Sequence, residues 1–145
     1  MKPNMWCWSE VCKTDPKHVK KVGFLSAIDA YSQFERATWM FGPCGQGWGL
    51  RAPVPYQLLP FNDETLIQVN AVFFWRDPDS GLEHELPAIG AAKLVAKDKR
   101  GVNLDGDALK KACTDACTKA LSMLGFNADV FLGAFDSNKY TGGKR

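Results

Sequence analysis

The chain has 145 residues, 46% of them hydrophobic, and a formal net charge of only +2. This length and composition predict a single domain over residues 1–145, in which an N-terminal extension (1–23) precedes the core (24–136) and a polar tail (137–145). The sequence contains no run of 18 apolar residues and no secretory signal, so we expect a protein that stays in the cytoplasm. Its five cysteines include no C-x-x-C pair, and neither a disulfide framework nor a metal site is expected.

Charge is distributed unevenly along the chain. Residues 1–60 hold seven basic and four acidic side chains, residues 61–90 hold one and six, and residues 91–145 hold ten and six. Such asymmetry is typical of a protein that binds a polyanion through one face, although most charge runs are simply solvated. The acidic middle segment is then expected to face elsewhere, for example towards a neighbouring subunit.

The first predicted element is a helix over residues 25–41. Apolar side chains recur there at steps of three and four residues, from Leu25 to Phe41. Ser26 is the candidate N-cap, and the following Gly42-Pro43 pair is expected to end the helix.

Four glycines occur in the next stretch, "FGPCGQGWG", residues 41–49. Phosphate-binding loops connect a strand to a helix, because the helix N-terminus presents free N–H groups to the anion. Here the glycines follow a helix and lead into an extended segment, and neither nucleotide-binding glycine motif is present. We therefore expect a tight turn around Trp48 and no bound nucleotide.

A small antiparallel sheet is predicted next. Residues 48–61 look extended, but three prolines restrict them to edge or irregular pairing. Residues 64–77 alternate between apolar and polar side chains, which is typical of a half-buried strand. The turn sequence "DPDSG" (77–81) should close an antiparallel hairpin with residues 82–90.

The clearest helix covers residues 107–124 and is followed by Gly125, which should end it. A short helical piece is expected within residues 127–135. The polar side of the main helix is predicted to comprise Lys111, Thr114, Asp115, Thr118 and Ser122. The apolar side is predicted to comprise Leu109, Ala112, Cys113, Ala116, Cys117, Ala120, Leu121 and Leu124.

No signature of an enzyme accompanies these elements. His18 and His84 lack a nucleophile in a recognisable context, and Glu83 and Glu85 read as ordinary solvated acids. We therefore expect no catalytic residues and no cofactor.

Three motifs, in this order, resemble those of the phage single-strand annealing proteins of the Rad-fifty-two-like superfamily, the Sak-type recombinases. They are F-G-x-x-G-x-G-W from Phe41, K-x-A-x-T-D-A-x-x-x-A-L-x-x-L-G from Lys110, and D-x-x-K-Y from Asp136. The resemblance covers about residues 24–140. It implies an α+β fold with an N-terminal helix, a small β-β-β sheet packed on a long C-terminal helix, and a short helix after it.

The same resemblance implies a function in phage homologous recombination and DNA repair, in the cytoplasm of a bacterial host. Subunits would form a ring homo-oligomer that holds single-stranded DNA in a basic groove and anneals complementary strands without ATP. A phage exonuclease or a host single-stranded DNA-binding protein would be a further partner.

Basic residues near the main helix are the candidate DNA ligands, because lysine and arginine neutralise phosphates. Each could instead be a solubilising surface charge. Four lie in a predicted loop that enters the helix, two on its first turns, one further along it and one after the glycine turn. They are Lys93, Lys97, Lys99, Arg100, Lys110, Lys111, Lys119 and Arg51.

Lys119 falls at the edge of the apolar arc of the helix, and the resemblance aligns it with a basic residue that lines the groove. The alternative is a lysine that extends to solvent and pairs with Asp115 one turn earlier. Two departures from the family pattern are Thr118 and Ser122, which stand where relatives often carry cations.

The sequence is compatible with more than one role for its tryptophans and with other functions. Trp48 and Trp75 could stack on bases, or could belong to the core or to a subunit interface. A passive single-stranded DNA-binding protein is the first alternative function. A metal-dependent nuclease is the second, although the acids of residues 77–85 form no obvious Mg²⁺ site.

Overall fold

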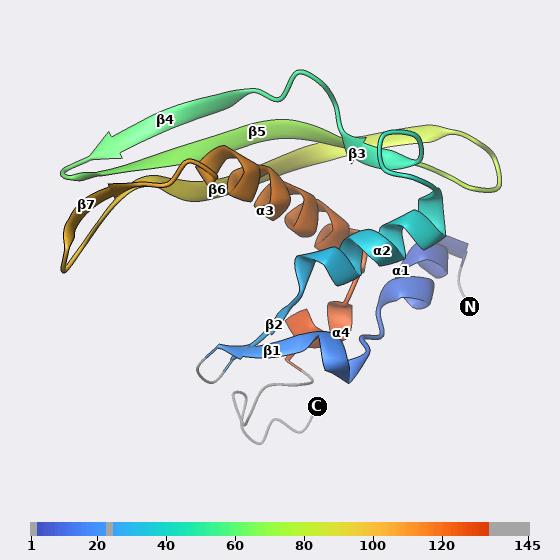
Figure 1. Cartoon of the computed structure of the whole chain (residues 1–145). Coiled ribbons are helices and arrows are strands. Elements are labelled where there is room, and N and C mark those ends of the chain that lie inside the picture. Colours follow the sequence, from blue (N-terminus) through green and yellow to red (C-terminus); the bar gives the residue numbers. More distant parts are fainter. Residues whose placement is uncertain (1–2, 23–24, 134–145) are drawn as a thin grey trace. The chain divides into compact units, whose positions relative to one another are not determined.

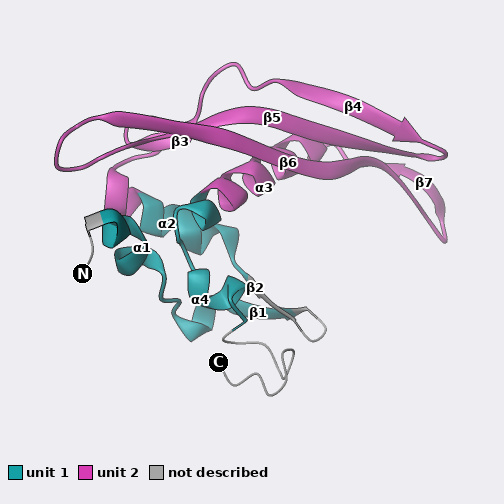
Figure 2. Cartoon of the chain, turned by 180° about the vertical axis from the view of Figure 1, so that it is seen from behind, with its two compact units in different colours: residues 1–37, 121–145 teal, residues 38–120 magenta. Residues whose placement is uncertain are grey.

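The structure is a computed structural model, and it describes residues 3–22 and 25–133. The chain divides into two compact units, residues 1–37 with 121–145 and residues 38–120 (Figure 2). We call these unit 1 and unit 2. Both α-helices and antiparallel sheets are present, so the α+β class is confirmed. None of the helices within the described ranges combines the length and the apolar character that a bilayer crossing requires.

Unit 2 is built around a five-stranded antiparallel sheet (Figure 1). Its strands are β3 (Trp48–Leu50), β4 (Tyr56–Phe61), β5 (Glu64–Arg76), β6 (Glu83–Asp98) and β7 (Gly101–Leu104). The order is β3-β5-β6-β7, and β4 pairs with the N-terminal half of β5 on the same side as β3. The predicted strand and its hairpin are confirmed, but the sheet has two more strands than the β-β-β arrangement that the resemblance implies.

The C-terminal part of β6 corrects the prediction of a basic loop. Residues 93–98 continue the strand, and only Lys99 and Arg100 form the turn between β6 and β7. Asp98 pairs with Gly101, whose φ of +117° is readily adopted by glycine. The chain reverses direction there, and β7 pairs with the end of β6. Two neighbouring strands explain why this stretch is strand: β5 pairs with Lys93 and Val95, and β7 pairs with residues 95–98.

One face of the sheet carries the core of unit 2. Alternate residues of β5 are buried on it, as the period of two predicts: Ile67, Val69, Ala71 and Phe73. The helix α3 (Ala108–Met123) contacts β6 on this side. A Cβ on Gly90 would overlap the backbone of α3 at Ala112 and Ala116, so this glycine allows the helix and the strand to approach closely. We call this side of the sheet the α3 face and the other side the outer face.

The predicted main helix is confirmed as α3, but only part of its predicted apolar side is fully buried: Cys113, Cys117 and Leu124 are half-buried. Four alanines spaced four residues apart are buried, namely Ala108, Ala112, Ala116 and Ala120, together with Leu121. Leu109, which was assigned to the apolar side, is exposed. Small side chains dominate the buried line because the backbones of helix and strand lie so close.

Unit 1 contains η1 (Pro3–Met5), α1 (Trp6–Val11), η2 (Pro16–His18), β1 (Val19–Val22), β2 (Leu25–Ile28), the start of α2 (Ala30–Phe41) and α4 (Ala128–Phe131). The predicted helix over 25–41 is wrong in its first turn, because residues 25–28 pair with β1 as an antiparallel hairpin. Ser26 therefore lies in a strand. The carboxylate of Asp29 accepts a hydrogen bond from the Tyr31 N–H and begins the helix instead.

The segment predicted as an N-terminal extension is bonded to the C-terminal part of unit 1. Thr14 donates from its backbone N–H and its hydroxyl to the Asp129 carboxylate, at 2.9 and 2.5 Å. The Asn127 side chain donates to the Thr14 hydroxyl, and the side chain of Val11 is buried. A Cβ on Gly125 would lie within 3 Å of the Trp8 ring, so the ring packs directly on the glycine that ends α3.

Candidate nucleic-acid interface

The glycine-rich loop forms a tight turn between α2 and β3. Gly42 has a φ of +107° and donates to the Thr38 carbonyl at 2.9 Å, so it ends α2 as predicted. A Cβ on Gly47 would overlap the Phe41 carbonyl, which requires glycine there. The Gly45 N–H donates to the Trp48 carbonyl at 2.6 Å, and the Trp48 side chain is buried. The glycines therefore serve the turn and the burial of Trp48, which belongs to the core.

The β6–β7 turn and the first turn of α3 present exposed cations for which the described part of the chain supplies no carboxylate partner. Lys99, Arg100 and Lys110 are exposed, and none of them forms an ion pair among the residues that the structure describes. Charged side chains of this kind are available to phosphate without breaking an existing contact.

Two predicted lysines of β6 pair with acids of the β4–β5 turn. Lys93 Nζ lies 3.3 Å from Glu64, and Lys97 Nζ lies 2.9 Å from Asp63. Glu64 also accepts the Lys97 N–H, and this hydrogen bond together with that from Lys93 lowers the pKa of its carboxyl group. All these groups are exposed, and such pairs contribute little to stability.

A register shift separates these two lysines onto different faces of the sheet. Leu66 pairs with Lys93, whereas the preceding Thr65 pairs with Val95, so Leu94 is the extra residue of a bulge. Lys93 shares the outer face with Leu66, and Lys97 follows Val95 onto the α3 face. The cations that were predicted as one cluster are therefore divided between two faces.

Both predicted lysines further along α3 are ion-paired. Lys111 Nζ lies 2.6 Å from Asp105, and its hydrogen bond lowers the pKa of that carboxyl group while the carboxylate raises the pKa of Lys111. Lys119 Nζ lies 3.0 Å from Asp115, with 63% of its side chain exposed. Asp115 also accepts the Ala91 N–H of β6 at 3.0 Å. In this structure Lys119 therefore extends to solvent and pairs with Asp115, which is the alternative to a DNA contact that the sequence suggested.

Arg51 is held on the outer face by two glutamates. Its Nε donates to Glu85 at 2.9 Å and a terminal nitrogen donates to Glu83 at 2.7 Å, while the guanidinium lies 4.2 Å from the centre of the Phe74 ring. Arg76 donates to the same Glu83, so the pKa of this carboxyl is lowered by both arginines, most by Arg51. These glutamates are not the free solvated acids that the sequence suggested, and Arg51 lies on the face opposite α3.

Sequence reasoning named no site in unit 1, although four exposed lysines lie close together in its sequence. The segment "KTDPKHVKK" was the available signal. The four are Lys13, Lys17, Lys20 and Lys21.

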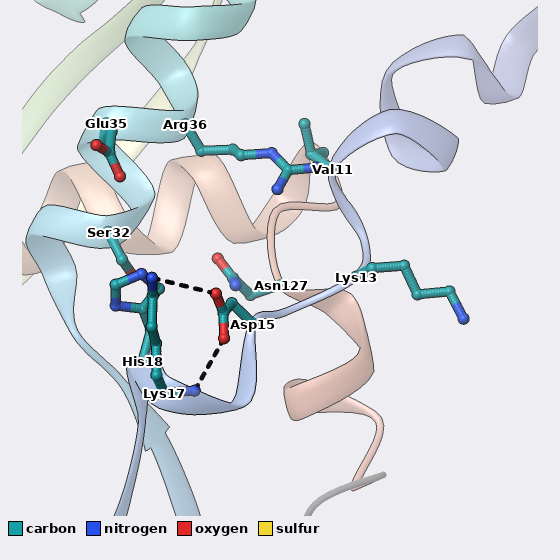
Figure 3. Close-up of a pocket in the computed structure, with 9 residues that line it drawn as sticks. All are labelled: Val11, Lys13, Asp15, Lys17, His18, Ser32, Glu35, Arg36 and Asn127. Atoms are coloured by element: carbon teal, nitrogen blue, oxygen red, sulfur yellow. Dashed lines mark hydrogen bonds and ion pairs between the residues drawn. The ribbon is translucent and has the colours of Figure 1, made fainter.

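A small cavity of about 210 Å³ lies in unit 1 (Figure 3). Acidic and basic groups both line it: Lys13, Asp15, Lys17, His18, Glu35 and Arg36, with Val11, Ser32 and Asn127. Asp15 accepts the Lys17 N–H, which lowers the pKa of its carboxyl, and Arg36 donates to the Glu10 carbonyl. Because the two signs of charge are mixed, this cavity does not attract a polyanion as a one-signed cleft would.

The thiols of Cys7 and Cys117 have pKa values well above their ordinary range. Burial raises the pKa of Cys7 to about 11, and burial with the nearby Cys44 and Cys113 raises that of Cys117 to about 12. Within residues 3–22 and 25–133, no cluster of three metal-binding side chains occurs. The third motif of the resemblance, D-x-x-K-Y from Asp136, lies outside these ranges.

Comparison of the chain with models of known protein families and with curated proteins found no match. The candidate residues are therefore placed by the sequence motifs and by the geometry of unit 2.

Proposed function

We propose that this chain is an ATP-independent single-stranded DNA-binding and strand-annealing protein that works as a ring oligomer. The observation that carries the proposal is that Lys99, Arg100 and Lys110, at the β6–β7 turn and the first turn of α3, are exposed and form no ion pair with another described residue. They lie after the glycine turn, in or just before the K-x-A-x-T-D-A helix, and the order of these two motifs resembles that of the phage annealing proteins. A role in phage recombination in a bacterial cytoplasm follows from the same resemblance, as does partnership with an exonuclease or a host single-stranded DNA-binding protein.

A long helix packed on an antiparallel sheet is the core that this resemblance implies. The fit of Gly90 against the backbone of α3 supports it, as does the hydrogen bond from the Ala91 N–H to Asp115. Small buried alanines and a strand glycine hold helix and strand together, while the lysines of α3 remain exposed to solvent. Lys110 and Lys111 are exposed in the first turn of this helix.

Phosphate binding by these cations requires no bond chemistry. Lys99, Arg100 and Lys110 would neutralise phosphates of an extended strand and release its counterions, and the bases would stay free to pair. Base pairing with a complementary strand then supplies the free energy of annealing. The proposed function therefore includes no nucleotide hydrolysis, no cofactor and no enzymatic step.

The ion-paired lysines can join this site at little cost. Exposed ion pairs contribute little to stability, so a phosphate can replace the carboxylate that Lys97 or Lys111 contacts in the free protein. Lys93 is less suited to this site, because it lies on the outer face, opposite α3. Arg51 is a weaker candidate, because two glutamates and an aromatic ring hold its guanidinium.

Binding and annealing of labelled oligonucleotides, without ATP and with EDTA present, test the proposal. We expect tight binding to single strands, weaker binding to duplex, a steep fall in affinity with salt, and faster annealing of complementary strands. Binding without faster annealing would identify a passive single-stranded DNA-binding protein instead. Strand cleavage after Mg²⁺ is added would identify a nuclease.

Charge-neutral variants locate the site. Changing Lys99, Arg100 and Lys110 together to glutamine should lower the salt slope of binding by about two to three. The matched control changes Lys13, Lys17 and Lys20 of unit 1 to glutamine, with the same loss of net charge. Equal losses in both triple variants would show that net charge, rather than the β6–β7 turn and α3, determines binding.

A further inference from the structure

The five-stranded sheet has two open edges at the same end. At this end four residues lie side by side across the sheet, each paired with the next. They are Pro60 of β4, Thr65 of β5, Val95 of β6 and Leu104 of β7. β4 and β7 are therefore the outer strands of one four-strand row, as Figure 1 shows. Elsewhere along β6, the N–H of Ala91 is taken by Asp115 of α3.

Backbone hydrogen bonds identify which groups of these edge strands point away from the sheet. The Asn70 N–H donates to the Pro55 carbonyl, so by the alternation of antiparallel pairs Tyr56, Leu58 and Pro60 direct their backbone groups outwards. The Asp105 N–H donates to the Leu94 carbonyl, so Val102 and Leu104 direct theirs outwards. Each edge thus offers two N–H groups two residues apart.

The side chains of these four residues are apolar and exposed on the α3 face. Tyr56 is 56% exposed, Leu58 49%, Val102 59% and Leu104 72%. They share this face because their partners Val69, Ile67, Lys97 and Val95 belong to it. Open strand edges lined by apolar side chains pair readily with another strand unless charge or proline blocks them.

We propose that β7 of one copy pairs with β4 of a second copy, so that the sheet continues from subunit to subunit. β4 and β7 run in opposite directions within one copy, because three antiparallel pairings separate them. Copies in the same orientation therefore bring β7 and β4 together as antiparallel neighbours. A head-to-tail contact of this kind repeats and can close into a ring.

The geometry also selects a register. Val102 opposite Leu58 and Leu104 opposite Tyr56 form two hydrogen-bonded pairs with four backbone hydrogen bonds. A shift of two residues places Val102 opposite Pro60, which lacks an N–H, and loses one of these bonds. Pro60 therefore disfavours the shifted register.

Charge complementarity favours a second copy as the occupant of each edge. The β6–β7 turn carries Lys99 and Arg100, and the β4–β5 turn carries Asp63, with Glu64 directly after it at the start of β5. Both acids pair with lysines of β6 in the free chain, but these exposed pairs are weak enough to be exchanged for cations of a neighbouring copy. In the selected register the basic turn extends from Val102 along the neighbour's β4 towards its acidic turn. Pairing of β7 with a second β7 would instead leave the two acidic turns unmatched.

Engineered cysteines test the junction directly. Hydrogen-bonded antiparallel pairs have Cα atoms about 5.5 Å apart, within the range of a disulfide. The double variant Tyr56→Cys with Leu104→Cys should form a ladder of covalent oligomers on mild oxidation, and mixed single variants should form dimers containing one of each. The one-residue control, Gln57→Cys with Leu104→Cys, places the two thiols on opposite faces and should form none. The unmodified protein, with its five native cysteines, gives the background.

Leu104→Pro provides a second readout. Proline removes the outward N–H of Leu104 without removing a hydrogen bond to β6, so circular dichroism should be unchanged while sedimentation velocity shows loss of the oligomer. Leu104→Ala keeps the N–H and should dissociate less. Covalent dimers of Leu104→Cys alone, or an oligomer with no crosslink above background, would overturn the proposed junction.

This inference rests on the proposed ring assembly but not on DNA binding. Crosslinked oligomers that fail to bind single-stranded DNA would leave the junction standing and refute the proposed function. A strict monomer at micromolar concentration, with and without DNA, would refute both the junction and the ring.

Discussion

Lys119 could bind DNA phosphate or could only form an ion pair with Asp115, and the variant Lys119→Glu distinguishes these two roles. In the free protein its Nζ lies 3.0 Å from Asp115, an exposed i,i+4 pair that contributes about 0.3–0.5 kcal/mol. Glutamate at this position repels Asp115 by a similar amount, so the expected loss of stability is about 0.6–1 kcal/mol, or about 2–5 °C in Tm. Folding should therefore survive.

Binding is expected to change far more than stability. If Lys119 leaves Asp115 for a phosphate when DNA binds, glutamate removes one contact and lowers the salt slope by about 0.7–1 per subunit. The defect recurs in every subunit along the strand, so annealing should fail. Thermal melting and annealing are measured on the same preparation.

Two further variants act as controls. Lys119→Gln removes the charge without repulsion and should weaken binding with little change in Tm. Asp115→Asn keeps an oxygen for the Ala91 N–H but releases Lys119, and should leave binding intact or stronger. A Lys119→Glu protein with lowered Tm and wild-type annealing would refute the DNA contact and leave the ion pair as its only role.

Three other predictions concern stability. The side-chain amide of Gln33 is 1% exposed with no hydrogen-bond partner among the described residues, so Gln33→Met should stabilise the protein by about 1–3 kcal/mol in chemical denaturation; a loss of stability would indicate a partner for the amide. Gly90→Ala should lower Tm strongly because its Cβ overlaps α3, whereas Gly106→Ala, which meets nothing within 4 Å, should change it little; equal effects would contradict the close approach. The pKa values of Glu64 and Glu83 are lower in the folded protein than the unfolded value of 4.5, so their ionised carboxylates stabilise the fold above pH 4.5. This stabilisation is lost as pH falls through the folded pKa. Tm should therefore decrease below about pH 4.5, and it should decrease less in Glu83→Gln. An unchanged pH profile in that variant would show that the arginine pairs of Glu83 do not stabilise the fold.

Local patterns in the sequence determined several elements. Alternating side chains predicted the strand that forms β5, the turn residues of "DPDSG" predicted the hairpin, and helical periodicity predicted α3. Gly42 was expected to end α2 and does so with a positive φ. Each of these features depends on backbone preferences and side-chain period over a few residues, and such signals are contained in the sequence itself.

Only the tertiary structure decided the start of α2 and the length of β6. Residues 25–28 have apolar spacing that suits a helix, but β1 supplies strand partners that no local pattern reveals. Residues 93–98 look like a basic loop, but β5 pairs with the start of this stretch and β7 with residues 95–98. Pairing energy comes from segments distant in the sequence and overrides local preference.

The candidate site was predicted as a set of residue types but not as a surface. The bulge at Leu94 sends Lys93 and Lys97 to different faces, and strand register brings Arg51 to Glu83 and Glu85, more than 30 residues away. The candidate lysines and arginines could be named from the sequence because a side chain's charge depends on its residue type alone. Which of them stay unpaired depends on carboxylates that only the folded sheet brings within a few ångströms.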